Sequence, residues 1–371
     1  MKKLIGVVLS LFFVFVPLPY SFAESSVVKI VSTPHQTFTG DFRDDDLAQE
    51  LTPSGRLGQL VYVPNVRSKI WVIDPSLIDE VIAMTGDYKI IGNTLPVGKR
   101  IATNWLSQLK KVSFSNDVIS LAYGNPDVVL ARHLSPSELK AYYSYGKKKL
   151  EVVLGRAVRT AAGTEFNAGT SRISSAQRLS YSANRKALTR LSRVVKHADV
   201  SDLRMKLSRL LTPTLDKASR EYFTANAAAA VSTQTHKLRV NAGKYQITTE
   251  SAELPVTVIN QFPVDVTVDI DMMAKNSRIL VFGFTGVRLP ANSKTQLELA
   301  AQVIAPGETT IFAQITDSKA VPIVDFSILQ LNATVIDPRV TWFTTGAAIL
   351  LLLAAIAHSL RRVRKGRTNE I

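Results

Sequence analysis

The sequence contains no cysteine, and its few histidines are scattered along 371 residues. Without cysteine the chain has no disulfide bond, no thiolate metal site and no cysteine nucleophile. The five histidines form no HxxxH or HExxH pair, so a zinc site lacks its usual ligands. The GxSxG, GxxxxGK[ST] and GxGxxG patterns are also absent from the sequence. The sequence therefore predicts no metal site and no cofactor, and it favours a non-enzymatic role.

Acidic residues are the scarcer charge, and the formal net charge is +15. Residues 96–240 hold 25 Lys and Arg against 9 Asp and Glu, an excess of 16 that accounts for the whole imbalance. A basic segment outside the cell meets anionic lipid headgroups or anionic wall polymers rather than nucleic acid. The alternative is a solvated surface with no specific partner.

The stretch Val340–Leu360 lacks any charged residue. Its 21 positions span roughly 31 Å as a helix, about one hydrocarbon thickness. The basic tail at 361–371 follows directly, and its cations are Arg361, Arg362, Arg364, Lys365 and Arg367. Such a cluster stays on the cytoplasmic side of a membrane. We therefore predict a transmembrane helix at 340–360, with the bulk of the chain beyond the cell membrane. A buried core helix is the alternative.

The pattern of residues 1–23 predicts a signal peptide. Lys2 and Lys3 precede the 13-residue apolar run Leu4–Val16, and Ser21 and Ala23 supply small residues for cleavage before Glu24. An uncleaved anchor at the amino terminus is the other interpretation.

Between residues 40 and 160, short apolar runs alternate with helical patterns. Ile70–Ile73 is typical of a buried strand, and Asp74-Pro75 then suits a helix cap with proline in the first turn. Val118–Tyr123 is a second such strand, followed by helical patterns that extend to about Leu154. This alternation predicts a parallel sheet covered by helices, an incomplete, barrel-like α/β module.

Asp74 and Asp127 each follow the carboxyl end of a predicted strand, the edge where ligands gather in α/β proteins. Two carboxylates there are weak candidates for an acid/base pair of the kind that hydrolyses glycosides. The stronger interpretation is that both cap helices.

Residues 165–235 predict basic amphipathic helices, which we expect to pack on the sheet module rather than lie on lipid. In the first helix, Leu179, Ala183, Leu188, Leu191 and Val195 are expected on one face. Residues 238–336 change to a period of two, with seven short strands separated by turn residues. This pattern predicts an immunoglobulin-like β-sandwich, so the whole chain is of the α+β multidomain class.

The order of these parts resembles an uncharacterised actinobacterial family of exported proteins that are anchored in the membrane at their carboxyl end. The resemblance covers about residues 44–365. It rests on Gly55–Leu57, Trp71–Pro75, Trp105-Leu106, Tyr123–Asp127, Leu254–Asn260 and the terminal helix with its arginine tail. Members are often encoded beside a lipid II flippase of the MurJ/MviN type. The resemblance implies a role at the cell envelope, in support of wall assembly, and implies no catalytic residues.

Three functions are consistent with the sequence. The favoured one is a single-pass envelope protein with a structural or binding role, whose partners are the membrane and a wall polymer or membrane protein. The second is a carbohydrate-active enzyme, or a degenerate relative, that uses Asp74 and Asp127. The third is an accessory subunit of a flippase, which it would contact through the small residues Gly346, Ala347 and Ala348 of the terminal helix.

Overall fold

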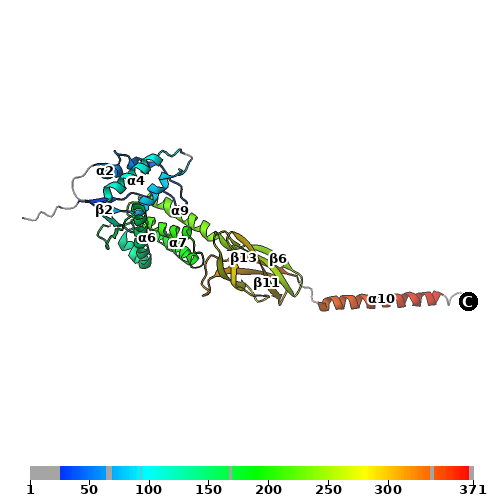
Figure 1. Cartoon of the computed structure of the whole chain (residues 1–371). Coiled ribbons are helices and arrows are strands. Elements are labelled where there is room, and N and C mark those ends of the chain that lie inside the picture. The colour runs from blue at the N-terminus through cyan, green and yellow to red at the C-terminus, as the bar shows by residue number, and fades with distance from the viewer. Residues whose placement is uncertain (1–25, 64–68, 93, 167–168, 335–337, 367–371) are drawn as a thin grey trace, which may run out of the picture.

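The computed structural model describes residues 26–63, 69–92, 94–166, 169–334 and 338–366. The side chains at 338–341 and 362–366 are outside this description. The predicted signal peptide and Arg367 therefore lie outside the described residues. Figure 1 shows the parts in a row: a sheet with helices, a helical layer, a β-sandwich and the isolated helix α10.

The first part is an open sheet of four parallel strands in the order β1-β2-β3-β4. Its strands are β1 (Ser26–Ile30), β2 (Lys69–Ile73), β3 (Asp117–Ser120) and β4 (Arg159–Thr160). The predicted strands at 70–73 and 118–123 are confirmed as β2 and β3, although β3 is shorter. β1 was not predicted, because its five residues precede the region in which strands and helices alternate.

Six helices accompany this sheet in the described part of the chain. They are α1 (Asp46–Leu51), α2 (Arg56–Tyr62), α3 (Pro75–Thr85), α4 (Lys99–Ser113), α5 (Val128–Leu134) and α6 (Pro136–Leu154). Trp71 and Trp105 are nearly inaccessible in the core that β1 and β2 share with α1 to α4. Burial of such large side chains stabilises the module, because each removes a large apolar area from water.

The helical layer follows. It contains α7 (Ser175–Val194), α8 (Ala198–Lys206), the 3₁₀ turn η1 (Leu207–Leu211) and α9 (Lys217–His236). Ser174 caps α7 in a capping box with Gln177. Leu188, Leu191 and Val195 are buried, but Leu179 is 71% exposed and Ala183 is exposed as well, so these two do not belong to the packed face. The buried face of α7 belongs to the core that the helical layer shares with the sandwich, and α7 meets the sheet module at α6, where the Tyr142 and Tyr181 hydroxyls lie 2.8 Å apart.

The sandwich has nine described strands in two sheets, in the orders β10-β8-β12-β13-β6 and β5-β7-β11-β9. The strands are β5 (Leu238–Val240), β6 (Gly243–Ile247), β7 (Ser251–Asn260), β8 (Val266–Ala274), β9 (Ile279–Val281), β10 (Phe284–Leu289), β11 (Ser293–Val303), β12 (Gly307–Thr316) and β13 (Ser327–Ala333). The prediction of one strand over 279–284 was wrong, because β9 pairs with β11 whereas β10 pairs with β8 in the other sheet.

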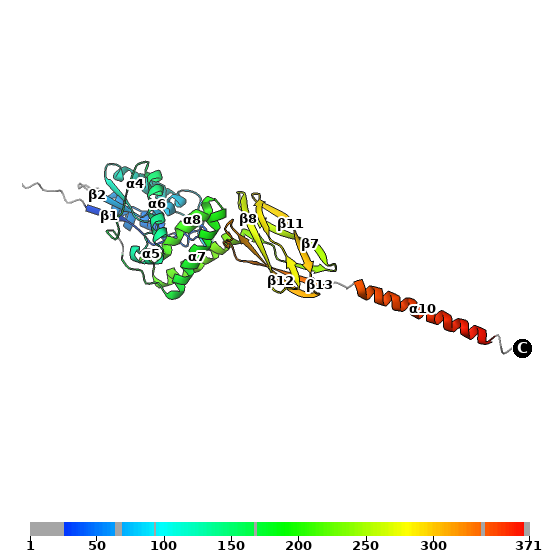
Figure 2. The same cartoon turned by 90° about the horizontal axis from the view of Figure 1, so that it is seen from below.

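The apolar core of the sandwich continues into the helical layer. Leu238 and Val258 belong to the same buried cluster as Leu188 and Leu191 of α7. At the opposite end of the sandwich the chain continues to α10 (Pro338–Gly366). Figure 2 shows that the strands run lengthwise between the helical layer and α10.

Helix α10 contains one segment, Trp342–Arg361, that is long and apolar enough to cross a membrane, and none of it is buried against the rest of the chain. The leucines of its central turns are more than half exposed. An isolated helix with this much exposed apolar surface needs an apolar environment to cover it.

Candidate functional site

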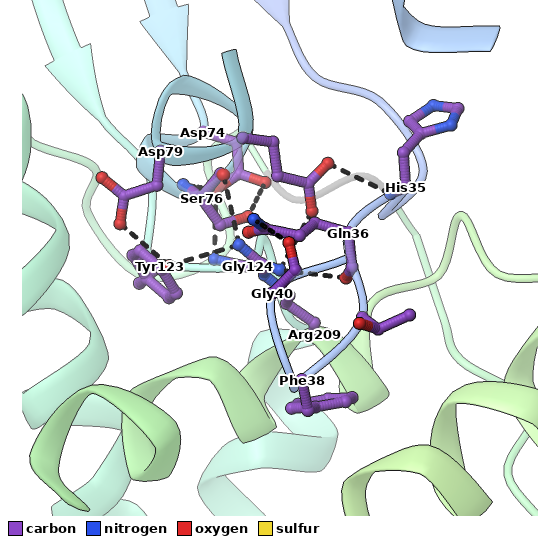
Figure 3. Close-up of polar contacts among 12 residues, drawn as sticks. His35, Gln36, Phe38, Gly40, Asp74, Ser76, Asp79, Tyr123, Gly124 and Arg209 are labelled. Atoms are coloured by element: carbon purple, nitrogen blue, oxygen red, sulfur yellow. Dashed lines mark hydrogen bonds and ion pairs between the residues drawn. The ribbon is translucent and has the colours of Figure 1, made fainter. Parts of the chain in front are cut away.

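A buried cluster of charged and polar side chains lies at the carboxyl edge of the parallel sheet. Three segments that follow the strands converge there: His35–Thr37 in the loop after β1, Asp74 with the first turn of α3 after β2, and Tyr123–Asn125 in the loop after β3. Arg209, which comes from the 3₁₀ turn η1 of the helical layer, lies among them in Figure 3. In parallel sheets this edge is the usual place for ligands and catalytic groups.

Asp74 is the N-cap residue of α3, and Pro75 occupies the first turn, as the sequence predicts. Its carboxylate accepts hydrogen bonds from the Ser76 N–H and hydroxyl, both at 2.9 Å, and from the Gly124 N–H at 3.0 Å. Burial raises the pKa of Asp74 to about 6, while these hydrogen bonds and the nearby Arg209 charge act in the opposite direction. The carboxyl group joins the loops after β2 and β3.

Arg209 and Glu80 form an ion pair in which both side chains are 2% exposed, and Arg209 Nη1 lies 3.0 Å from Glu80 Oε1. The other Glu80 oxygen accepts the backbone N–H of His35 at 3.0 Å. Arg209 also donates to the carbonyl oxygens of Gln36 and Ser76, each at 3.4 Å. The pair thereby connects η1 to α3 and to the loop after β1.

Tyr123 completes the cluster. Its hydroxyl donates to Asp79 Oδ2 at 3.0 Å and accepts from Arg209 Nη2 at 3.3 Å. The Arg209 guanidinium carbon lies 5.7 Å from the centre of the tyrosine ring. Gly124 follows with φ of +76°, and a Cβ built there would lie 2.5 Å from Ser208 Oγ, so only glycine fits between this loop and η1.

Asp127 lies elsewhere in the same region and has a different set of partners. It caps α5 by accepting the Leu130 N–H at 3.0 Å, and its second oxygen accepts the Ser171 N–H at 2.8 Å. Both candidate carboxylates are therefore engaged as helix caps, the arrangement that argues against their use as an acid/base pair.

The cluster connects loops and is shielded from solvent. Taken as whole residues, Asp74 is 3% exposed, Glu80 1% and Arg209 2%. A cavity of about 400 Å³ next to it is lined by Phe38, Asp202 and Lys206 among others, but by neither Asp74 nor Arg209. Among the described residues, no group of three or more His, Asp or Glu side chains is placed to hold a metal ion.

Glu80 and Arg209 are absent from the sequence-based candidates. A signal for Arg209 exists, because it stands among Leu207, Leu210 and Leu211, and a charge among apolar residues that become buried requires a partner. Nothing local identifies Glu80 as that partner. Of the predicted tail cations, Arg361 is exposed at the end of the apolar segment, and Arg362, Arg364 and Lys365 continue the helix backbone.

These features define a protein in which an open α/β sheet, a helical layer and a β-sandwich precede one apolar helix. The chain belongs to DUF6049, a family of unknown function whose sequence model matches residues 107–367. A comparison with curated proteins gave no match.

Among solved structures, the chain is similar to WR4, an MSP family member of C. elegans, with 14% identity over 26% of this chain and 98% of that one, at a TM-score of 0.20. It is also similar to the CARDB domain of PF1109 from Pyrococcus furiosus, with 16% identity over 26% and 94% of the two chains, at 0.21. The PapD-like domain 7 of human CEP192 shares 11% identity over 27% and 86%, at 0.21. At these TM-scores the similarities carry no argument about function, and the sandwich rests on its own strand pairing.

Proposed function

We propose that this protein is a non-enzymatic, single-pass membrane protein with a binding or structural role on the outer side of the cell membrane. The observation that carries the proposal is helix α10, whose segment Trp342–Arg361 is apolar and has no buried residue. The arginine-rich tail that follows favours the cytoplasmic side, so residues before the helix lie beyond the membrane.

A binding role is favoured over catalysis because the polar groups at the sheet edge are already used. Asp74 and Asp127 cap helices, and Glu80 and Arg209 form an ion pair that is buried from solvent. A general acid or base must reach the substrate. The carbohydrate-active enzyme thus has weaker support than the binding protein.

The position of the basic region supports a wall polymer over lipid headgroups as the partner. The excess of Lys and Arg lies in residues 96–240, and most of this region is separated from α10 by the length of the sandwich. The surface potential of a membrane decays within about 10 Å at ordinary ionic strength. We propose that the region meets anionic polymer and that the protein supports wall assembly, with a membrane-protein partner at α10.

Labelling of single cysteines tests the orientation, since the natural chain has none. Gln296→Cys places a thiol at an exposed position of β11, and Thr368→Cys places one in the tail. A membrane-impermeant maleimide applied to intact, wall-stripped cells should modify the first variant and spare the second until the cells are lysed. Modification of the tail variant alone would overturn the proposal.

A further inference from the structure

The outer face of the five-stranded sheet carries two neighbouring rows of side chains, which are exposed or half-buried within the described part of the chain. The register places Met273 opposite Phe312 and Phe312 opposite Ile328, and we name these three residues the apolar row. Met273 is 65% exposed and Ile328 45%. The ring of Phe326 lies 5.2 Å from that of Phe312, almost perpendicular to it, and is 54% exposed.

The second row is polar and lies two residues further along the same strands. Thr310 is opposite Gln330, and Gln330 is opposite Lys244. The backbone N–H of Lys275 donates to Thr310 O at 2.8 Å, which adds Lys275 at the other end. These four residues form the polar row. With neighbouring strands about 4.8 Å apart, it extends about 14 Å across the sheet.

A cavity of about 610 Å³ lies over the polar row and is lined by all four of its residues. Glu308 and Asn332 also line it, and they form the pair two residues further along the strands from Thr310 and Gln330. The apolar row lies beside this cavity rather than in its lining, so the face combines an apolar row with hydroxyl, amide and ammonium groups at regular spacing. Two lysines at the ends of the polar row outweigh the single carboxylate of Glu308 in charge.

We infer that this face binds an anionic glycan chain. The inference rests on the proposed function, names the kind of polymer, and gives it a second contact on the sandwich besides the basic region at 96–240. A pyranose ring has an apolar face of C–H groups and a rim of hydroxyls. The first suits the half-buried ring of Phe312 and the exposed side chains of Met273 and Phe326 beside it, and the second suits Thr310 and Gln330. Lys244 and Lys275 are positioned for carboxylate or phosphate groups carried by the sugar chain.

The strands run lengthwise between the helical layer and α10, so the outer face of the sheet is turned sideways to the helix that would cross the membrane. The polar row lies toward the α10 end of the sandwich, because β12 begins at Gly307 and β13 ends at Ala333, from which the chain leads to α10. The apolar row lies two residues further from that end, so a sugar chain that contacts both rows extends along the face and away from α10. Anionic lipid headgroups share the charge of such a chain, and the vesicle arm of the test below separates the two.

The test measures binding of the purified full-length protein in detergent micelles. The probes are peptide-free peptidoglycan strands, which carry carboxylates, poly(glycerol phosphate), which carries phosphodiesters without sugar rings, and neutral chitin oligosaccharides. Phosphatidylglycerol vesicles form a separate arm. Wild-type protein should bind the peptidoglycan strands most tightly and in a salt-dependent manner.

Phe312→Ala should weaken binding of both sugar probes about tenfold at low and high salt, because it removes the stacking surface. The double variant Lys244→Ala/Lys275→Ala should bind peptidoglycan strands and neutral oligosaccharides equally and lose the salt dependence. Lys294→Ala, an exposed lysine of the opposite sheet, is the matched control and should change nothing. Gln330→Ala removes an exposed amide and supplies an independent variant of the polar row.

Three results would overturn the inference. They are unchanged sugar binding by Phe312→Ala and Gln330→Ala, row-dependent binding to vesicles in place of glycan, and a change of oligomeric state without a change in glycan affinity. None of these three results depends on the orientation of the protein in the membrane. The cysteine labelling described above therefore tests the proposed function independently.

Discussion

The sheet module and the sandwich place their polar groups in opposite ways. At the edge of the parallel sheet, Asp74, Glu80 and Arg209 face inward and bind one another and the backbone. In the sandwich the interior is almost wholly apolar, and the polar row and the apolar row face solvent. Inward polar groups specify how loops meet, while outward ones remain available to a ligand.

This contrast has a structural origin. Parallel strands all end at one edge, so their following loops crowd together and must satisfy their backbone groups there. Antiparallel strands alternate inward and outward residues, so one face can be apolar while the other carries chemistry. The predictions below test the contrast, from the largest expected effect to the smallest.

Arg209→Met should lower the free energy of unfolding by about 3–5 kcal/mol, because it leaves Glu80 buried without its counter-charge. Chemical denaturation of the protein in micelles measures this. The double variant Arg209→Met/Glu80→Gln should recover part of the loss, since no uncompensated charge remains. A loss below about 1 kcal/mol for the single variant would mean that the ion pair does not hold the loops together.

Asp74→Asn should change the pH dependence of stability. Because the pKa of Asp74 in the folded protein is about 6, above the usual 3.8, the folded state holds a proton that the unfolded state has released between these values. Stability from this group is therefore present below about pH 4 and is lost as the pH rises through 6, by on the order of 3 kcal/mol.

Unfolding of wild type and Asp74→Asn, compared from pH 4 to 7, isolates that change, since other groups titrate alike in both. The wild type should lose stability relative to the variant as the pH rises. A constant difference between the two proteins would show that Asp74 has an ordinary pKa.

Gly124→Ala should cost about 2 kcal/mol or more, because alanine is strained at φ of +76° and its Cβ would meet Ser208 and Arg209. Gly155→Ala is the matched control. It has φ of +66° but no atom within 4 Å of its built Cβ, so it should cost about 1 kcal/mol. If both variants lose equal stability in thermal unfolding, the close approach of η1 to Gly124 is not the cause of the loss in Gly124→Ala.

Arg193→Ala should leave the denaturation midpoint unchanged. The ion pair of Arg193 with Asp317 joins α7 to the sandwich at 3.1 Å, but the arginine side chain is 45% exposed and solvent screens it. Leu188→Ala, in the apolar core shared by both regions, should cost about 2–5 kcal/mol. A large effect of Arg193→Ala would mean that the ion pair, rather than apolar packing, holds the regions together.

Local patterns predicted several elements correctly. Asp74-Pro75 predicted a capped helix, and α3 begins there with the expected hydrogen bond. The period of two predicted most strands of the sandwich. The strand over 279–284 was wrong because sheet membership depends on partners elsewhere, and β9 and β10 find theirs in different sheets. Leu179 and Ala183 were assigned to the packed face of α7 by helical spacing, yet both side chains are exposed.

The sequence by itself determined the apolar terminal helix, the strand–turn–helix units and the alternation of the sandwich, because each depends on neighbours within a few residues. Only the tertiary structure decided that Arg209 meets Gln36, 173 positions away, and that Phe312 lies between Met273 and Ile328. Such contacts depend on how separate elements pack and pair, and residue spacing along the chain carries no information about that.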